Sequence, residues 1–223
     1  MRHIDAVNRG SLPLIPIESA SFRDLDAFCE LVSLVDPGQP VPLSVPIALS
    51  LRPGRLTHGH CLCLVARVDG KVAGALIASP PRWADEHPLR ASLGIGVLYI
   101  AAVSVFPKYR SQGIASRLLR AAERHSRMAG VRLLTLEHPP GLTGFYTRHG
   151  FTAGQERMLV VLPNGVQERK MPGHLSAVKP IAEGVRLAQV PGAPAPLVTG
   201  LLTRGCEIPP SAHYSENGLS AAP

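Results

Sequence analysis

A short segment near the middle of this 223-residue chain carries residue types that suit the binding of a phosphate group. In full it reads Val103-Ser104-Val105-Phe106-Pro107-Lys108-Tyr109-Arg110-Ser111-Gln112-Gly113-Ile114-Ala115-Ser116. A helix that begins at Ile114 directs its free backbone N–H groups and the positive end of its dipole toward one point. Gly113 and Ala115 are small enough to let an anion approach the backbone, and Arg110 adds positive charge. The segment therefore predicts an anion-binding turn, with a ligand-free strand-to-helix turn as the alternative.

Two elements must hold this turn in place. The apolar run from Gly96 to Val105 predicts a central strand that is buried on both faces. The residues from Ile114 to Ala129 predict an amphipathic helix, which Gly130 ends with a left-handed cap. The apolar face of this helix consists of Ile114, Leu118, Leu119, Ala122 and Ala129. Because residues 131–137 again read as a strand, the three elements predict a crossover between parallel neighbours.

The N-terminal half predicts further strands, one helix and a long irregular segment. The runs 61–68 and 71–79 favour strands, and Asp69-Gly70 between them is the typical signal of a tight hairpin. A helix is expected to begin after Ser21. Residues 37–59 contain five prolines, which indicates a loop or a broken helix.

The C-terminal part changes character after a short helix at residues 141–149 and a strand pair, or one long bent strand, at residues 151–162. From Pro172 onward there are 8 Pro and 6 Gly in 52 residues. We therefore predict one domain over residues 1–171 and a partly irregular extension over residues 172–223. Short apolar runs in the extension are expected to pack on the domain or on a partner chain, which makes a homodimer a possible assembly.

The net charge of +7 is concentrated around the predicted anion site. Residues 96–171 hold 11 basic and 4 acidic side chains, an excess equal to the charge of the whole chain. A compact polyanionic ligand suits such a surplus. A nucleic-acid module is the alternative from another class, because four arginines could follow a phosphate backbone along one helix face. These arginines are Arg117, Arg120, Arg124 and Arg127. Only ten residues are aromatic, which disfavours a surface that stacks single-stranded bases.

Two motifs together resemble the GNAT N-acetyltransferase family. The first is the Arg110-x-x-Gly113-x-Ala115 spacing after a strand, and the second is Phe145-Tyr146-Thr147-Arg148-His149-Gly150-Phe151. The resemblance covers residues 12–165 in the order of the elements. It implies a layered α/β fold in which helices flank a mixed central sheet with splayed parallel central strands. It also implies acetyl-coenzyme A (acetyl-CoA) as the co-substrate.

The same resemblance implies a set of coenzyme contacts. Backbone N–H groups from Arg110 to Ser116 would hold the pyrophosphate, and the end of the preceding strand would pair with the pantetheine arm. The N–H of Val105 would polarise the thioester carbonyl, and the hydroxyl of Tyr146 would protonate the departing thiolate. The implied cofactor-binding residues are Val103, Val105, Arg110, Ser111, Gln112, Gly113, Ile114, Ala115 and Ser116.

The base is less well defined than the acid. An acceptor amine has a pKa of about 10, so it must lose a proton before it attacks. The run from Tyr99 to Val105 carries no carboxylate, although family members often place a Glu there. Glu137, at the end of the neighbouring strand, is the first candidate base and His138 is the second. The segment 138–143 also lacks the Asn that many relatives use to hold the coenzyme.

These observations predict direct acetyl transfer to a primary amine of a small molecule or peptide within a ternary complex. Because no cysteine lies near the motifs, nothing in the sequence indicates a covalent enzyme intermediate. A catalytically idle coenzyme-binding domain is the alternative, and a nucleic-acid module is less favoured. Asp36, Asp85 and Glu86 are the few acidic residues in the expected acceptor region. A monoamine, an amino-acid derivative or a peptide amine therefore suits it better than a polycation.

The remaining features exclude other classes. His58, His60, Cys61 and Cys63 form a small cluster without a second ligand pair, so we predict buried thiols and no metal. The charge-free run 91–107 is at the short edge of a membrane span and better suits a buried strand, so no membrane association is expected. Four cysteines and no recognisable secretion signal indicate reduced thiols and a cytoplasmic protein.

Overall fold

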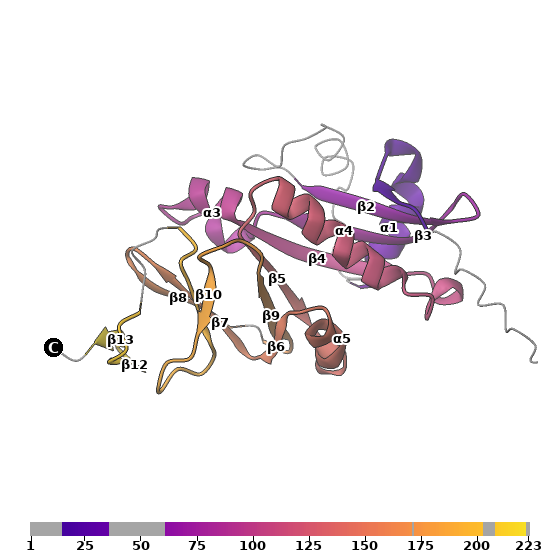
Figure 1. Cartoon of the computed structure of the whole chain (residues 1–223). Coiled ribbons are helices and arrows are strands. Elements are labelled where there is room, and N and C mark those ends of the chain that lie inside the picture. The colour runs from indigo at the N-terminus through magenta and orange to yellow at the C-terminus, as the bar shows by residue number, and fades with distance from the viewer. Residues whose placement is uncertain (1–14, 36–60, 171, 203–207, 222–223) are drawn as a thin grey trace, which may run out of the picture.

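The computed structural model describes residues 15–35, 61–170, 172–202 and 208–221. Predictions for residues 37–59, including those for His58, lie outside the described residues, as does His60. A seven-stranded sheet forms the centre of the molecule in the order β1-β2-β3-β4-β5-β9-β6 (Figure 1). Its strands are β1 (Ile17–Ser19), β2 (Leu62–Val68), β3 (Lys71–Ser79), β4 (Val97–Val105), β5 (Leu133–His138), β9 (Leu175–Pro180) and β6 (Thr152–Gln155).

The predicted hairpin between β2 and β3 is confirmed. Asp69 and Gly70 have φ values of 49° and 74°, the left-handed conformation that the tight turn requires at both positions. The register places Val68 opposite Lys71, so the turn joins the strands directly. The central sheet therefore begins as an antiparallel meander that runs from β1 through β4.

The predicted crossover is also confirmed. Its two strands pair over the first part of their length and then separate. Helix α4 (Ile114–Met128) connects β4 to β5, which are parallel. Their pairing covers Val97–Ile100 and Leu133–Leu136 and then ends. β4 continues beside β3 as far as Val105, with a bulge at Ala101 where the register shifts. The mixed sheet therefore has splayed central strands, as the family resemblance implied.

Helices cover both faces of the central sheet. Helix α4 packs on β2, β3 and β4 through its buried residues Leu118, Leu119 and Ala122. Helix α1 (Leu25–Ser33) packs on the opposite face through Phe28 and Leu31. The other helical elements of the described residues are two shorter helices and four 3₁₀ turns. They are α3 (Arg90–Gly96), α5 (Thr143–Arg148), η1 (Phe22–Asp24), η2 (Arg82–Ala84), η3 (Pro107–Tyr109) and η4 (Pro140–Leu142).

A second, smaller sheet lies under β5 and β9, on the face away from α4. Its order is β10-β11-β7-β8, and a separate hairpin, β12-β13, follows it. The strands are β7 (Arg157–Leu162), β8 (Gly165–Lys170), β10 (Arg186–Ala188), β11 (Leu197–Thr199), β12 (Ala212–Ser215) and β13 (Gly218–Ala221). Met158 and Val160 of this sheet share one apolar core with Leu133 and Val178 of the central sheet.

Two expectations for the C-terminal part need correction. Residues 151–162 form neither a strand pair nor one bent strand, because the chain leaves the central sheet after β6 and enters the second sheet at β7. The predicted extension from residue 172 begins with β9, which lies between β5 and β6 in the central sheet. A composition averaged over 52 residues concealed the buried run at residues 176–178.

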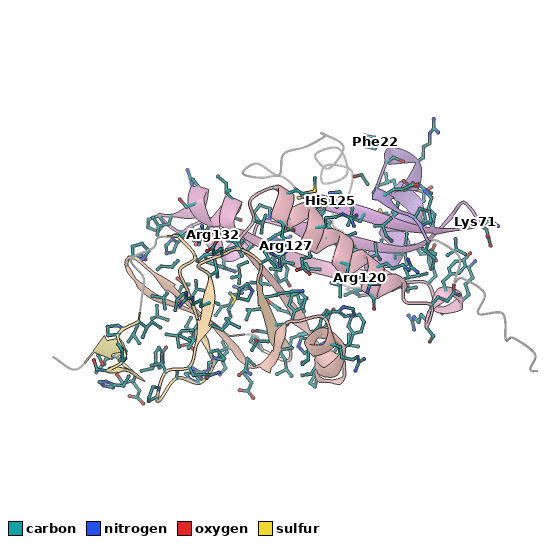
Figure 2. All side chains as sticks on the ribbon, in the orientation of Figure 1. Phe22, Lys71, Arg120, His125, Arg127 and Arg132 are labelled. Atoms are coloured by element: carbon teal, nitrogen blue, oxygen red, sulfur yellow. The ribbon has the colours of Figure 1, made fainter. Side chains whose placement is uncertain are left out.

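Tertiary contacts join the rest of this region to the molecule. Arg132, labelled in Figure 2 beside Arg127, donates hydrogen bonds to the carbonyl oxygens of Gly200 and Glu183. Among the described residues, no helix has both the length and the apolar character needed to cross a membrane. The apolar run 91–107 instead forms most of α3 and all of β4.

Candidate active site

A cavity of about 630 Å³ opens where β4 separates from β5. The predicted coenzyme residues line it, apart from Gln112, and so does Tyr146. The described lining residues are Leu34, Val35, Val103, Ser104, Val105, Tyr109, Arg110, Ser111, Gly113, Ile114, Ala115, Ser116, Leu142, Phe145, Tyr146, Arg148 and His149. The charged groups among them are arginines, and no carboxylate occurs in this set. The cavity therefore favours an anion.

The turn before α4 has the backbone geometry of an anion-binding loop. Ser111 and Gly113 both have positive φ, 64° and 73°. No atom lies within 4 Å of a Cβ added to Gly113, so it is the backbone conformation that requires glycine here. The N–H of Arg117 donates to the carbonyl of Gly113 at 3.0 Å and makes the first helical bond. The N–H groups of residues 114–116 precede it and have no partner within the helix.

A second glycine brings this turn close to the sheet. Gly74 lies on β3 under the first residue of α4, and a Cβ added there would be 2.8 Å from Ile114 Cγ2. The same Cβ would be 3.0 Å from the carbonyl oxygen of Ser104. Because real Cβ atoms do not approach this closely, Gly74 allows the start of α4 to rest directly on β3 and β4.

The free edge of β4 faces the cavity. Among the described residues, β4 beyond Ile100 pairs with β3 only, so no described strand occupies its other edge, where an extended chain could add by hydrogen bonding. Arg110 Nε donates a hydrogen bond to the carbonyl oxygen of Val105 at 3.2 Å. The guanidinium therefore occupies the end of the open edge in this structure.

Tyr146 forms part of the cavity wall on α5. Its side chain is 7% exposed, and three rings surround it: those of His138, Phe145 and Phe151, with centroid distances of 5.1, 5.2 and 5.9 Å. Burial raises the pKa of Tyr146. The phenol is therefore protonated at neutral pH and available as a proton donor.

A contact between Ser116 and His149 was missed by the sequence analysis. Ser116 Oγ in the first turn of α4 lies 2.9 Å from His149 Nε2 at the end of α5. Burial lowers the pKa of His149, and the charges of Arg120, Lys179 and Arg148 lower it further. The ring is thus neutral at pH 7. Its only sequence signal is its place inside the second motif, between Tyr146 and Gly150.

Glu137 does not line the cavity. Side chains alternate along β5, so Glu137 shares the face of Leu133, which packs on the second sheet, whereas Leu134 and Leu136 face α4. Its side chain is 25% exposed, and its Oε1 lies 3.8 Å from an amino group of Arg169 on β8. The structure therefore separates Glu137 and Tyr146 onto opposite faces of the sheet.

His138 shares the face of Tyr146 and is almost fully buried, at 1% exposed. Its Nδ1 lies 2.8 Å from the carbonyl oxygen of Pro139, which assigns the proton to Nδ1. Its Nε2 has no hydrogen-bond partner among the described residues.

No group of three or more His, Cys, Asp or Glu side chains in the described part of the chain is arranged to hold a metal ion. Cys63 is fully buried in the core beneath α1, where burial raises the pKa of its thiol. Arg127, one of the four arginines considered for nucleic acid, is bonded to Glu123 and to the carbonyl of Ile181.

Solved structures of similar fold include enzymes that carry coenzyme A. PaiA N-acetyltransferase from Thermoplasma acidophilum, solved with coenzyme A, matches with a TM-score of 0.52 and 17% identity over 75% of this chain and 99% of that one. N-acetylglutamate synthase from Neisseria gonorrhoeae, solved with coenzyme A and N-acetyl-glutamate, matches with a TM-score of 0.52 and 16% identity. That match covers 76% of this chain and 36% of the synthase. At these identities the likeness concerns the fold.

Sequence comparison adds a relative and a family. An uncharacterized N-acetyltransferase of Escherichia coli (strain K12), YjhQ, is 30% identical over 92 residues, which are 40% of this chain and 45% of YjhQ. The match thus spans less than half of the length of this relative. A sequence profile of the acetyltransferase (GNAT) family matches residues 29–151, more than half of the chain and the whole region that builds the cavity. The chain therefore belongs to the GNAT family of N-acetyltransferases.

Proposed function

We propose that this protein transfers the acetyl group of acetyl-CoA to a primary amine of a small molecule or peptide by direct attack in a ternary complex. One observation carries the proposal: a cavity with basic lining joins the free N–H groups at the start of α4, the open edge of β4 and the phenol of Tyr146. These three features suit the pyrophosphate, the pantetheine arm and the leaving thiolate in that order.

The binding half of the proposal uses the backbone. The N–H groups of residues 110–116 bind the pyrophosphate at the positive end of the α4 dipole. The pantetheine arm adds to the open edge of β4 as an extra strand would. Arg110 leaves the carbonyl of Val105 when the arm pairs there, and its guanidinium is then free for a phosphate.

The chemical half needs an electrophile, an acid and a base. The amine nitrogen attacks the thioester carbonyl carbon, whose oxygen the N–H of Val105 polarises, and a C–N bond forms. The tetrahedral intermediate then breaks its C–S bond. Tyr146 donates its proton to the departing thiolate, and its high pKa suits this role as general acid.

We place the base on the other face of the sheet. Glu137 is accessible at the end of β5 and takes the proton that the ammonium must lose. With coenzyme on the α4 face, the amine approaches through the gap between the splayed strands from the side of Glu137. His138 Nε2 is the second candidate, because it is an acceptor without a partner next to Tyr146.

The decisive experiment combines coenzyme binding with an acceptor panel. Saturating acetyl-CoA should raise the melting temperature, and release of free thiol should reveal turnover with monoamines, amino-acid derivatives or peptides. Stabilisation without turnover on any amine would favour an idle coenzyme-binding domain. Absence of stabilisation would overturn the ligand itself, and salt-dependent binding of duplex DNA would favour the nucleic-acid alternative.

A further inference from the structure

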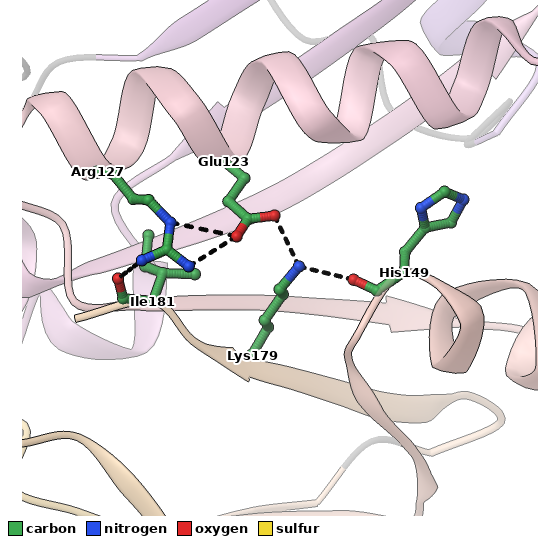
Figure 3. A network of polar contacts seen from close by, with 5 residues as sticks. All are labelled: Glu123, Arg127, His149, Lys179 and Ile181. Carbon is green, nitrogen blue, oxygen red and sulfur yellow. Dashed lines mark hydrogen bonds and ion pairs between the residues drawn. The ribbon is translucent and has the colours of Figure 1, made fainter. Parts of the chain in front are cut away.

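Lys179 lies at the centre of a polar network that joins three elements of the active-site region (Figure 3). It comes from β9, beyond the boundary that the sequence suggested at residue 171. Its Nζ lies 2.6 Å from Glu123 Oε2 on α4 and donates to the carbonyl oxygen of His149 at 2.7 Å. The Lys179 side chain is 17% exposed, so both contacts are largely shielded from water.

Glu123 is held from two sides. Its Oε2 accepts from Lys179, and its Oε1 accepts from Arg127 at 2.8 Å. Burial alone would raise the pKa of Glu123, but the hydrogen bonds from Lys179 and Arg127 outweigh it and lower the pKa. Glu123 is therefore a carboxylate at neutral pH, and it anchors both cations to α4.

His149 links this network to the cavity. Its carbonyl accepts from Lys179, while its ring contacts Ser116 in the first turn of α4. His149 caps the end of α5, three residues after Tyr146. His149 thus connects α5, which carries Tyr146, to two other elements. Its backbone carbonyl contacts β9, and its ring contacts the turn at residues 110–116, called here the coenzyme turn.

We propose that Lys179 is a positioning residue for acetyl transfer, which holds the end of α5 so that Tyr146 is correctly placed against the leaving thiolate. This inference rests on the proposed function. Besides its packing on β6 and in the core, α5 is held at its C-terminal end by the contacts of His149 with Lys179 and Ser116, and a shift of about 1 Å at a reacting group can cost a large factor in rate. The turn at residues 110–116 rests on the sheet at Gly74, so we expect it to keep its backbone geometry when Lys179 is lost, although Ser116 contacts His149.

The test compares Lys179→Met with Arg127→Met. Both variants remove one cation from Glu123, but only the first removes the bond to α5. We expect Lys179→Met to lower kcat by about tenfold or more while the Kd for coenzyme A stays within about threefold. Arg127→Met should lose stability and keep kcat. Lys179→Arg, which retains a donor, should recover part of the lost rate.

A second readout does not require turnover. The charge of Lys179 is one of those that lower the pKa of His149, with Arg120 and Arg148. An NMR titration of His149 should therefore show a higher pKa in Lys179→Met, with a changed ring environment, and little change in Arg127→Met.

Equal kcat in Lys179→Met and the parent, or a His149 ring environment that is unchanged between them, would overturn the positioning role. Equal kcat loss in the two Met variants would overturn it as well, because the effect would then come from Glu123. If the parent binds coenzyme but acetylates no amine, the proposed function fails. The NMR ring signals of His149 and Tyr146 in Lys179→Met, compared with those of the parent, then still decide whether Lys179 positions α5.

Discussion

The two faces of the central sheet differ at the place where β4 and β5 separate. On the α4 face the chain builds a cavity from backbone features: two residues with positive φ, unbonded helical N–H groups and an open strand edge. On the opposite face, the proposed base Glu137 forms an ion pair with Arg169. In the proposed reaction, coenzyme recognition therefore depends on main-chain geometry, whereas acceptor chemistry depends on a few replaceable side chains.

The strongest way to test the α4 face is Tyr146→Phe. If the phenol is the general acid, its removal should lower kcat by about 100-fold or more and leave coenzyme affinity nearly unchanged. Tyr109→Phe is the matched control, because Tyr109 lines the same cavity. Steady-state kinetics and calorimetric titration with coenzyme A measure the two quantities. Equal rates in Tyr146→Phe and the parent would remove this residue as the acid.

The corresponding test of the other face is Glu137→Gln. Loss of a general base should lower kcat by about 100-fold, with less effect on coenzyme binding. Arg169→Gln is the control, since it breaks the ion pair and keeps the carboxylate, so its loss should be much smaller. If Glu137→Gln retains its rate while His138→Gln loses it, the base lies on the same face as Tyr146. The proposal that acid and base lie on opposite faces of the sheet is then wrong.

Gly74→Ala tests whether the coenzyme turn depends on close packing. The new methyl group meets Ile114 Cγ2 at 2.8 Å and the Ser104 carbonyl at 3.0 Å, so the start of α4 must move. We expect coenzyme affinity to fall by about tenfold, or about 1.4 kcal/mol, with little effect on the KM for the amine. Gly141→Ala is the control, because no atom lies within 4 Å of its added Cβ. Equal affinities in all three proteins would contradict the packing argument.

Thr135→Val tests a buried hydroxyl on the face of Glu137 by its effect on the free energy of unfolding. Thr135 Oγ1 is buried on the face of Glu137 without a partner among the described residues. Replacement by an isosteric apolar side chain should raise the free energy of unfolding by up to about 1 kcal/mol, measured in urea. Ser126→Ala removes a similarly unpartnered hydroxyl on α4. A Thr135→Val variant that instead raises the KM for the amine would assign this hydroxyl to the acceptor.

The smallest expected effect is a pH dependence at His149. Its folded pKa lies below the ordinary value of about 6.5, so the unfolded chain takes up the proton first and stability falls as pH drops below that value. His149→Gln should remove this part of the dependence. Bound coenzyme, a polyanion beside the ring, should raise the pKa again and reverse the trend. Unfolding curves at pH 7.5 and 5.5, with and without coenzyme A, measure both effects.

Much of the α4 face could be predicted from local sequence patterns. Asp69-Gly70 fixes a hairpin turn by its φ values, and the amphipathic run from Ile114 specifies a helix that must bury one side. The coenzyme turn follows because both its small residues and its position after a strand are local properties. Tyr146 was placed at the site by the resemblance of residues 145–151 to the family motif, and it does line the cavity.

The rest depended on contacts between distant parts of the chain. Ser116 meets His149 across 33 residues, and Lys179 meets Glu123 across 56. No pattern in either segment marks these pairs. The face of Glu137 follows from alternation along β5, but its partner Arg169 arrives on a strand of the second sheet. The place of β9 in the central sheet was missed for the same reason, because strand order is set by tertiary packing.

The insertion of β9 between β5 and β6 also limits the order in which the central sheet can be completed. Leu134 pairs with Lys179, and Ala153 pairs with Ala177, so the last strand of the central sheet to be synthesised closes a gap between two that came earlier. Until then β5 and β6 each present an unpaired edge, which is a template for aggregation. Because β9 carries Lys179, the step that completes the central sheet also brings this side chain to the end of α5.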